Sequence, residues 1–187
     1  MTLSEEAIID RRWARSLRRF AGGTKVRYWI NGRPRRLGGR PRRLGDGTRA
    51  EPISSREARF IRSTFAAVDR LTGLRFVEKS SKARTEIDLY RVGDFGQRGL
   101  LGQATRNSGW FEIAWENRGG NRLTRSERIT ITHEIGHTLG LDHPNGRPFS
   151  PRYDTGDTVM SYNRIPGGGG GFTSTDIAAL QLLWGVG

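Results

Sequence analysis

Residues 133–143 read HEIGHTLGLDH, and this run holds all three histidines of the chain. On an α-helix, His133 and His137 are four residues apart and project from the same face. Glu134 follows the first histidine and lies beside that face. Gly140 suits the left-handed residue that ends a helix, because glycine adopts this conformation at little cost. The chain can then turn back and bring His143 to the other two histidines.

This spacing indicates a zinc site. Three histidine ligands and one position open to water are typical of catalytic zinc, whereas a structural site has a fourth protein ligand, often cysteine. The chain contains no cysteine. With zinc to activate water, Glu134 would act as general base and then as general acid in the hydrolysis of a peptide bond. The competing interpretation is a metal site without catalysis or a cluster of hydrogen-bonded histidines.

A second motif lies at residues 158–162, which read TVMSY. Met160 is the single methionine apart from the first residue. Its polarizable thioether is suited to pack beneath three imidazoles, although ordinary core filling would also explain it. Tyr162 lies two residues further on, where its phenol would reach the metal site or lie half-buried in the core.

Together these motifs make the chain similar to the catalytic domain of the serralysin-type metzincins, which are bacterial zinc endopeptidases. The resemblance is carried by residues 132–141, His143-Pro144, Met160-Ser161-Tyr162, the glycine-rich run 167–171 and residues 176–185. It covers residues 85–187 well and residues 24–84 only in outline. The chain differs from the family in two respects. It stops where members usually carry calcium-binding repeats, and it has an arginine-rich insertion at residues 32–49.

The resemblance implies a role for each motif residue. The zinc ligands would be His133, His137 and His143. Glu134 would be the catalytic base, and Met160 would form the Met-turn beneath the metal. Tyr162 would ligate zinc in the resting enzyme and swing away to stabilise the oxyanion. Calcium is chemically compatible with three carboxylates of the later loops, but their spacing supports no defined site: Asp142, Asp154 and Asp157.

In this family a peptide substrate pairs as an extra strand with the edge strand of the sheet above the zinc. Residues 101–105 correspond to that strand, and the expected substrate-binding residues are Leu101, Gly102, Gln103 and Ala104. Because backbone pairing is largely blind to side chains, broad specificity is expected. Residues 163–172 would form the wall of the pocket beside the scissile bond, with Arg164 near enough to line it.

The resemblance also implies an extracellular enzyme that acts on proteins or peptides, and we expect a monomer. The first residues lack the basic and apolar regions of a secretory signal peptide. No stretch approaches the roughly 20 apolar residues that a membrane-spanning helix needs. The export route therefore stays open.

The net charge of +13 is concentrated in residues 11–49, where Asp46 is the single acidic residue. The tract contains the tandem repeat GRPRRLG at residues 32–38 and 39–45. Proline and glycine interrupt helices and central strands, so an exposed basic loop is expected. It would bind an anionic surface or polymer, or be a solvated insertion without a partner. The alternative function is therefore a catalytically inactive metzincin-fold protein that binds acidic partners through this loop.

Residues 1–22 are expected to form an N-terminal segment, either a short amphipathic helix over residues 5–20 or the remnant of a pro-segment. Residues 23–187 would form the metzincin catalytic domain. Helical periodicity predicts a helix from Ser54 or Ser55 to about Thr72. Thr124 and Glu127 form a capping box for the helix with the histidines. A last helix would run from residue 173 or 174 to about residue 184.

Strands are expected at residues 25–31, 74–78, 85–92, 101–106 and 110–115. The predicted fold class is therefore α/β (α+β). It consists of a twisted, mainly parallel sheet with two helices, an active-site cleft, and an irregular lower subdomain that holds the Met-turn and the C-terminal helix.

Overall fold

The computed structural model describes residues 2–36, 48–120, 122–167 and 170–187. The helices are η1 (Glu5–Ile8), α1 (Arg11–Ala21), α2 (Ser55–Leu71), α3 (Arg125–Leu139), η2 (Pro144–Gly146) and α4 (Ser174–Trp184). The strands are β1 (Lys25–Ile30), β2 (Arg35–Arg36), β3 (Arg49–Glu51), β4 (Arg75–Glu78), β5 (Ile87–Val92), β6 (Gly102–Arg106) and β7 (Phe111–Glu116). Most of the tandem repeat, residues 37–47, lies outside the described residues.

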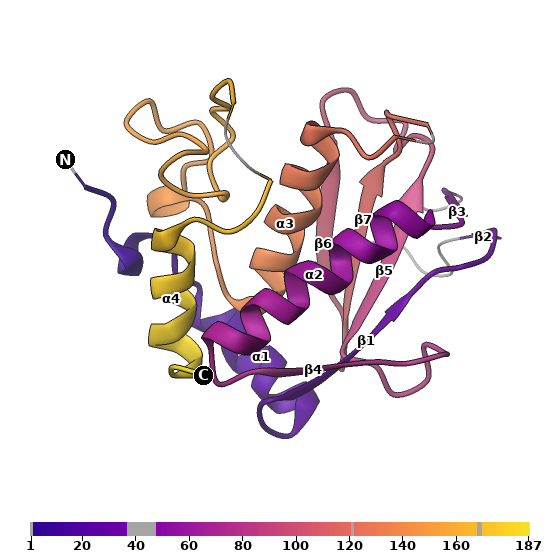
Figure 1. Ribbon diagram of the computed structural model, residues 1–187, viewed down its shortest axis with the longest axis horizontal. Helices are drawn as coiled ribbons and strands as arrows, with labels where there is room; N and C mark the ends of the chain where they lie inside the picture. Colours follow the sequence, from indigo (N-terminus) through magenta and orange to yellow (C-terminus); the bar gives the residue numbers. More distant parts are fainter. Residues whose placement is uncertain (1, 37–47, 121, 168–169) are drawn as a thin grey trace.

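The described strands form one sheet with a parallel centre (Figure 1). β5 pairs in parallel with β1 on one side and with β7 on the other, and β4 continues the parallel set beyond β1. The antiparallel pairs are β2 with β3, β3 with the end of β5, and β6 with β7. The prediction of a mixed α/β fold with a mainly parallel sheet is confirmed.

The strand β2 corrects the expectation of a loop throughout the tandem repeat, residues 32–45, and β3 is a strand that the sequence did not predict. Arg35 pairs with Ala50 and Arg36 with Arg49, so both described ends of the loop are attached to the sheet. This pairing is compatible with Pro34, because β2 is very short and lies at the edge of the sheet, where a proline costs little. The basic loop therefore leaves from a defined position beside β5.

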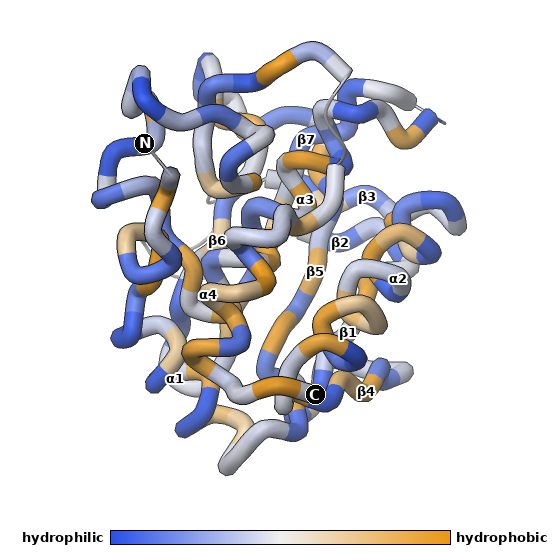
Figure 2. Tube along the Cα trace, turned by 60° about the vertical axis from the view of Figure 1, so that its left-hand side comes forward, coloured by the Kyte–Doolittle hydropathy of each residue, from blue (hydrophilic) through white to orange (hydrophobic). Residues whose placement is uncertain are grey.

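The main core lies between the sheet and the helices α2 and α3, which cross one of its faces (Figure 1). Figure 2 shows hydrophobic residues along β5 and α2 and polar residues in the surrounding loops. Fully buried side chains include Ile61, Phe65, Leu89, Ile113 and Trp115. Burying one such side chain contributes about 1.5–3 kcal/mol. This packing holds α3, which carries the histidines, firmly against the sheet.

The helices α2, α3 and α4 begin where the sequence predicts. Capping boxes are present at α2, α3 and α4, each with a Ser or Thr side chain that accepts a hydrogen bond from the third residue of the helix. Such caps satisfy backbone N–H groups that the helix itself leaves free. Among the described residues, each helix is too short or too polar to cross a bilayer.

The N-terminal segment is broken into η1 and α1, and the predicted single helix over residues 5–20 is wrong. Asp10 accepts hydrogen bonds from the backbone N–H groups of Arg12 and Trp13 and starts a new helix there. Ile9 forms a β-bridge with Leu141 instead of continuing the first turn. Apolar side chains of this segment, such as Ile8 and Leu17, are fully buried in the main core. The segment thus packs directly behind the end of α3.

Candidate metal centre and active-site cleft

The end of α3 brings the third histidine to the first two. Gly140 has φ 98° and ends the helix in the left-handed region, as the sequence predicts. A Cβ at this position would also lie 2.7 Å from the Cβ of Ala14, so α1 packs too closely for a side chain. The N–H of Leu141 then donates to the carbonyl of Gly136 at 2.9 Å. This reversal of the chain places His143 beside the helix.

The three histidines converge on one point. Each offers a nitrogen, and these atoms all lie within 4.8 Å of one another. The Nδ1 atom of His133 lies 2.9 Å from the carbonyl oxygen of Val159, and that of His137 lies 3.0 Å from the carbonyl oxygen of Leu141. Carbonyl partners of this kind fix the ring so that Nε2 is free to bind a metal.

The remaining nitrogens fit a metal ion. The Nε2 atoms of His133 and His143 are buried and have no hydrogen-bond partner among the described residues. An unpaired buried polar atom is costly unless something binds it. Burial lowers the pKa of His133, and burial followed by the charge of His143 lowers the pKa of His137 to about 4. Neutral imidazoles with free Nε2 atoms are what a divalent transition metal requires.

Glu134 lies beside the histidines and is buried. Burial raises the pKa of its carboxyl to about 8, against a backbone hydrogen bond from Ala104 that lowers it. The backbone of β6 passes close to this group, because a Cβ on Gly102 would lie 2.8 Å from Oε1 of Glu134. A glycine at this point lets the edge strand approach the carboxyl. A carboxyl with one protein partner and a raised pKa is suited to exchange protons.

Tyr162 packs against the rings of His133 and His143. Its ring centroid is 5.3 Å from that of His133 and 5.0 Å from that of His143. The residue is 44% exposed, and among the described residues its hydroxyl makes no hydrogen bond. Burial of the phenol, followed by the charge of Glu134, raises the pKa of Tyr162. The structure therefore places this phenol beside the three histidines, with its hydroxyl available for a hydrogen bond.

Met160 lies beneath α3 and is fully buried. Its sulfur packs so close to the helix that a Cβ on Gly136 would lie 2.8 Å from it. The turn is held by Asp176 of α4, whose carboxylate accepts hydrogen bonds from the hydroxyl of Thr158 and from the N–H of Val159 at 3.0 Å. Val159 is also the carbonyl partner of His133. The sequence placed Asp176 only near the start of the last helix, and its contact with the turn depends on packing between distant segments.

A cleft runs past Glu134 along the edge strand β6, which among the described strands pairs with β7 alone. A cavity of about 440 Å³ lies on one side and includes Leu101, Gly102 and Arg164 in its wall. A cavity of about 270 Å³ on the other side includes Gln103 and Ala104. The structure thus brings all four residues expected to bind substrate to the cleft. Of the described residues in the expected wall 163–172, Arg164 alone lines the larger cavity.

Two residues of the N-terminal segment also line the smaller cavity, and sequence reasoning missed them. Asp10 and Trp13 face this space together with His137. The ring of Trp13 stacks on Phe111 with centroids 5.1 Å apart and lies 6.0 Å from the ring of His137. The amphipathic helix predicted over residues 5–20 did not show which surface Trp13 would meet.

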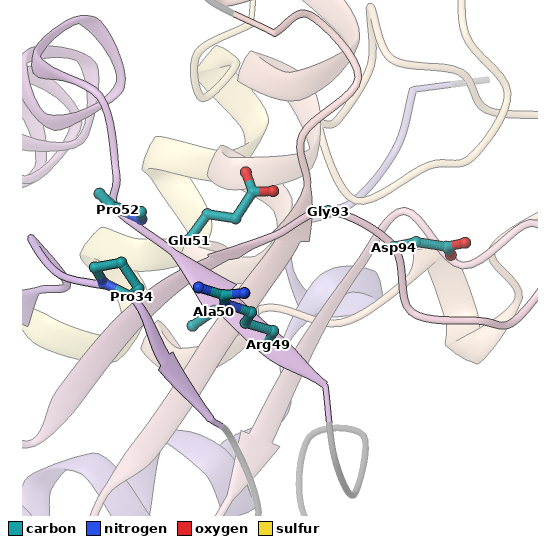
Figure 3. Close-up of a pocket in the computed structure, with 7 residues that line it drawn as sticks. All are labelled: Pro34, Arg49, Ala50, Glu51, Pro52, Gly93 and Asp94. Atoms are coloured by element: carbon teal, nitrogen blue, oxygen red, sulfur yellow. The ribbon is translucent and has the colours of Figure 1, made fainter.

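Another cavity, of about 350 Å³, lies beside β3 and the loop that follows β5 (Figure 3). Its acidic residues are Glu51 and Asp94, and the carboxylate of Asp94 points away from Glu51. Glu51 is engaged by Arg91 at 3.2 Å and by the side-chain amide of Asn117 at 3.1 Å. With its acidic groups used in this way, this cavity offers no comparable cluster of metal ligands, and the histidine cleft is the better candidate site.

Comparison with known proteins points to the same chemistry over part of the chain. The metalloprotease AprA of Pseudomonas entomophila (strain L48) is 42% identical over 32% of this chain. Serralysin G and serralysin C of Dickeya chrysanthemi are 36% and 34% identical over 42% and 41% of it. The chain is similar to serralysin-type metalloproteases over about two fifths of its length. It spans only 17–20% of the length of these relatives.

The fold has a relative among solved structures. The GM1 bound form of the ECX AB5 holotoxin contains a chain that superposes with a TM-score of 0.55 at 15% identity, covering 98% of this chain and 86% of that chain. At this identity the likeness concerns the fold alone. No protein-family model matches the chain.

Proposed function

We propose that the chain is the catalytic domain of a zinc-dependent endopeptidase of the serralysin type, with a metzincin fold. The observation that carries the proposal is the convergence of three histidines, two of them with buried and unpaired Nε2 atoms, beside the buried carboxyl of Glu134. The partial similarity to metalloproteases supports it independently. The proposed substrate is a protein or peptide.

His133, His137 and His143 would hold the zinc ion. A bound zinc ion acts as a Lewis acid toward the scissile carbonyl and lowers the pKa of water at its open position toward about 7. The two carbonyl groups behind the rings of His133 and His137 keep each Nδ1 protonated and each Nε2 available. Asp142 performs the corresponding task for His143, because its carboxylate lies 3.4 Å from Nδ1 of that ring.

Glu134 is the proposed general base. Its carboxylate takes a proton from the attacking water while the water oxygen bonds to the carbonyl carbon, and it passes the proton to the amine nitrogen as the C–N bond breaks. The phenol of Tyr162 would donate a hydrogen bond to the oxygen that becomes negative during the attack. The free edge of β6 would hold the substrate as an added strand, with the scissile bond beside Glu134.

The proposal is tested by comparing the wild type with Glu134→Gln. Both proteins should bind about one zinc ion per chain by elemental analysis, since glutamate is not a ligand. Only the wild type should cleave casein or a quenched-fluorescent peptide, with chelator sensitivity, and the variant should lose about 10²–10⁴-fold in kcat/KM. Glu6→Gln, which changes an exposed carboxylate on η1, serves as the control. Equal cleavage by Glu134→Gln and the wild type would refute the assigned role.

The alternative of an inactive, anion-binding protein has one observation in its favour. Beside the basic loop, Arg33, Arg35 and Lys82 line a cavity of about 560 Å³ that also contains Trp29. This alternative requires that the wild type hold zinc, cleave nothing in a broad peptide mixture, and bind heparin. Deleting residues 37–45 should then abolish heparin binding, whereas the proposed peptidase should retain cleavage after the same deletion.

A further inference from the structure

The larger cavity of the cleft has an unusual charge distribution. Its charged side chains are Arg98, Arg164 and Glu134. Glu134 is assigned to proton transfer, so the other charged side chains of the cavity are positive. The surroundings of Arg164 therefore favour an additional negative charge.

The guanidinium of Arg164 is held in place by neutral groups. Nη1 donates to the hydroxyl of Ser126, and Nη2 donates to the hydroxyl of Thr130 at 3.2 Å. Among the described residues, no carboxylate lies within ion-pairing distance of Arg164. Arginine presents five N–H groups, so donors remain for a ligand. A fixed guanidinium without a counter-charge is a ready site for a carboxylate, which it can bind through two parallel hydrogen bonds.

The separation of Arg164 and Glu134 can be estimated along α3. Ser126, Thr130 and Glu134 follow one another at intervals of four residues and lie on one face of α3. Four residues correspond to about 6 Å along a helix. The guanidinium contacts Ser126 and Thr130 and thus lies between one and two helical turns along α3 from Glu134. Arg164 and Glu134 line the same cavity, so this cavity adjoins the position proposed for the peptide bond.

The walls of the cavity suit the stem of such a side chain. Leu100, Leu101, Ile129 and Phe149 provide apolar surface in the wall of the cavity. The volume of about 440 Å³ accommodates one amino-acid side chain with room for water. A cavity with apolar walls and a cation in its lining is complementary to methylene groups that end in a carboxylate.

We propose that this cavity is a specificity pocket for an acidic side chain, aspartate or glutamate, adjoining the scissile bond, and that Arg164 is its recognition residue. The inference rests on the proposed peptidase function and narrows it. It replaces the broad specificity expected from backbone pairing alone with a preference at one position. Because Arg164 contacts no ligand nitrogen of the metal site, its replacement should change selectivity more than metal content.

The cleavage experiment uses an unbiased peptide mixture digested by the zinc-loaded protein, with cleavage sites read by mass spectrometry. The wild type should show Asp and Glu enriched about 10-fold at one position flanking the cut, as expected for a charge-assisted pair. Arg164→Gln should lose the enrichment, and Arg164→Glu should replace it with Lys and Arg. Arg59→Gln, an exposed arginine on α2 away from the cavity, should behave as the wild type. No acidic enrichment in the wild type, or an unchanged preference in Arg164→Gln, would overturn the proposal.

A binding measurement separates this inference from the proposed function. Glu134→Gln should bind peptides without cleaving them, and a peptide with glutamate at the mapped position should bind about 10-fold more tightly than its glutamine counterpart. The double variant Glu134→Gln/Arg164→Gln should bind both equally. Selective binding without any cleavage by the wild type would uphold the pocket and refute the peptidase. Cleavage with equal binding of both peptides would uphold the peptidase and refute the pocket.

Discussion

Glu134 and Asp176 are both buried carboxyl groups within the same domain, yet their surroundings differ. Glu134 faces the cleft and has a backbone hydrogen bond from Ala104. Asp176 accepts hydrogen bonds from the hydroxyl of Thr158, the N–H of Val159, and both the N–H and the hydroxyl of Thr173. Burial raises the pKa of both groups. The number of partners, and not burial, distinguishes them.

The difference separates a reactive region from a supporting one. In the cleft, Glu134, Tyr162 and the Nε2 atoms of His133 and His143 have spare bonding capacity. Between α4 and the turn that carries Met160, the polar groups form hydrogen bonds with one another. Changes in the first region should alter activity and leave stability nearly intact, whereas changes in the second should mainly lower stability.

The largest expected effect on activity, after that of Glu134, belongs to Tyr162→Phe. Loss of one hydrogen-bond donor to the developing oxyanion typically lowers kcat about 10²–10³-fold. The hydroxyl has no partner in the described protein, so the free energy of unfolding should change by less than about 0.5 kcal/mol. Peptide hydrolysis and urea unfolding test both statements. A stability loss as large as the activity loss would show that Tyr162 belongs to the supporting region.

Asp176→Ala should have the opposite signature. Removing the carboxylate leaves buried donors on Thr158, Val159 and Thr173 without partners, and we expect a loss of about 2–4 kcal/mol in unfolding free energy. Because Val159 orients His133, zinc affinity should also fall about 10–100-fold. Chemical unfolding and competition with a zinc chelator provide the two readings. Asp94→Ala, which removes an exposed carboxylate, is the control. Equal effects of both changes would contradict the proposed role of Asp176 in holding the turn that carries Met160.

Asp88 tests whether burial alone accounts for a raised pKa. It is buried on β5, accepts a hydrogen bond from the hydroxyl of Thr85 at 2.6 Å, and has a pKa raised by burial to about 6. The folded state therefore holds this proton more tightly than the unfolded chain. Its stabilising contribution is complete below about pH 4 and is lost as the pH rises through about 6.

Asp88→Asn should remove this pH dependence. Between about pH 4 and pH 7.5, the variant should gain about 1–3 kcal/mol in unfolding free energy relative to the wild type. Urea unfolding at both pH values measures the change, and peptide hydrolysis should be retained. If the free energies of unfolding of the two proteins differed by the same amount at both pH values, ionisation of Asp88 would not destabilise the folded protein.

Gly136→Ala is expected to have the smallest effect. Alanine favours a helix by about 1 kcal/mol over glycine, but its Cβ would lie 2.8 Å from the sulfur of Met160 and 3.4 Å from Phe172. Overpacking costs about 1–3 kcal/mol, so a net loss of about 1 kcal/mol is expected. Combining it with Met160→Ala should cost less than the sum of the two single changes. Additive losses in unfolding free energy would show that α3 at Gly136 and the turn at Met160 are not in tight packing contact.

The elements that the sequence predicted correctly are those with local signals. Capping residues and helical periodicity gave α2, α3 and α4, and the spacing of the histidines gave their convergence. The break between η1 and α1 was missed, since it depends on the bridge from Ile9 to Leu141. The places of Trp13 and Asp176 likewise depend on contacts between distant segments. The extracellular location, the monomeric state and an anionic partner of the basic loop stay predictions.

The metal centre is tested most directly by zinc-edge X-ray absorption on the wild-type protein as isolated. We expect three imidazole nitrogens at about 2.0–2.1 Å and additional oxygen coordination, with no sulfur. In His143→Ala, one imidazole should be missing from the spectrum or the zinc should be lost. Zinc bound by fewer than three imidazoles in the wild type, or a spectrum unchanged in His143→Ala, would contradict the three-histidine site.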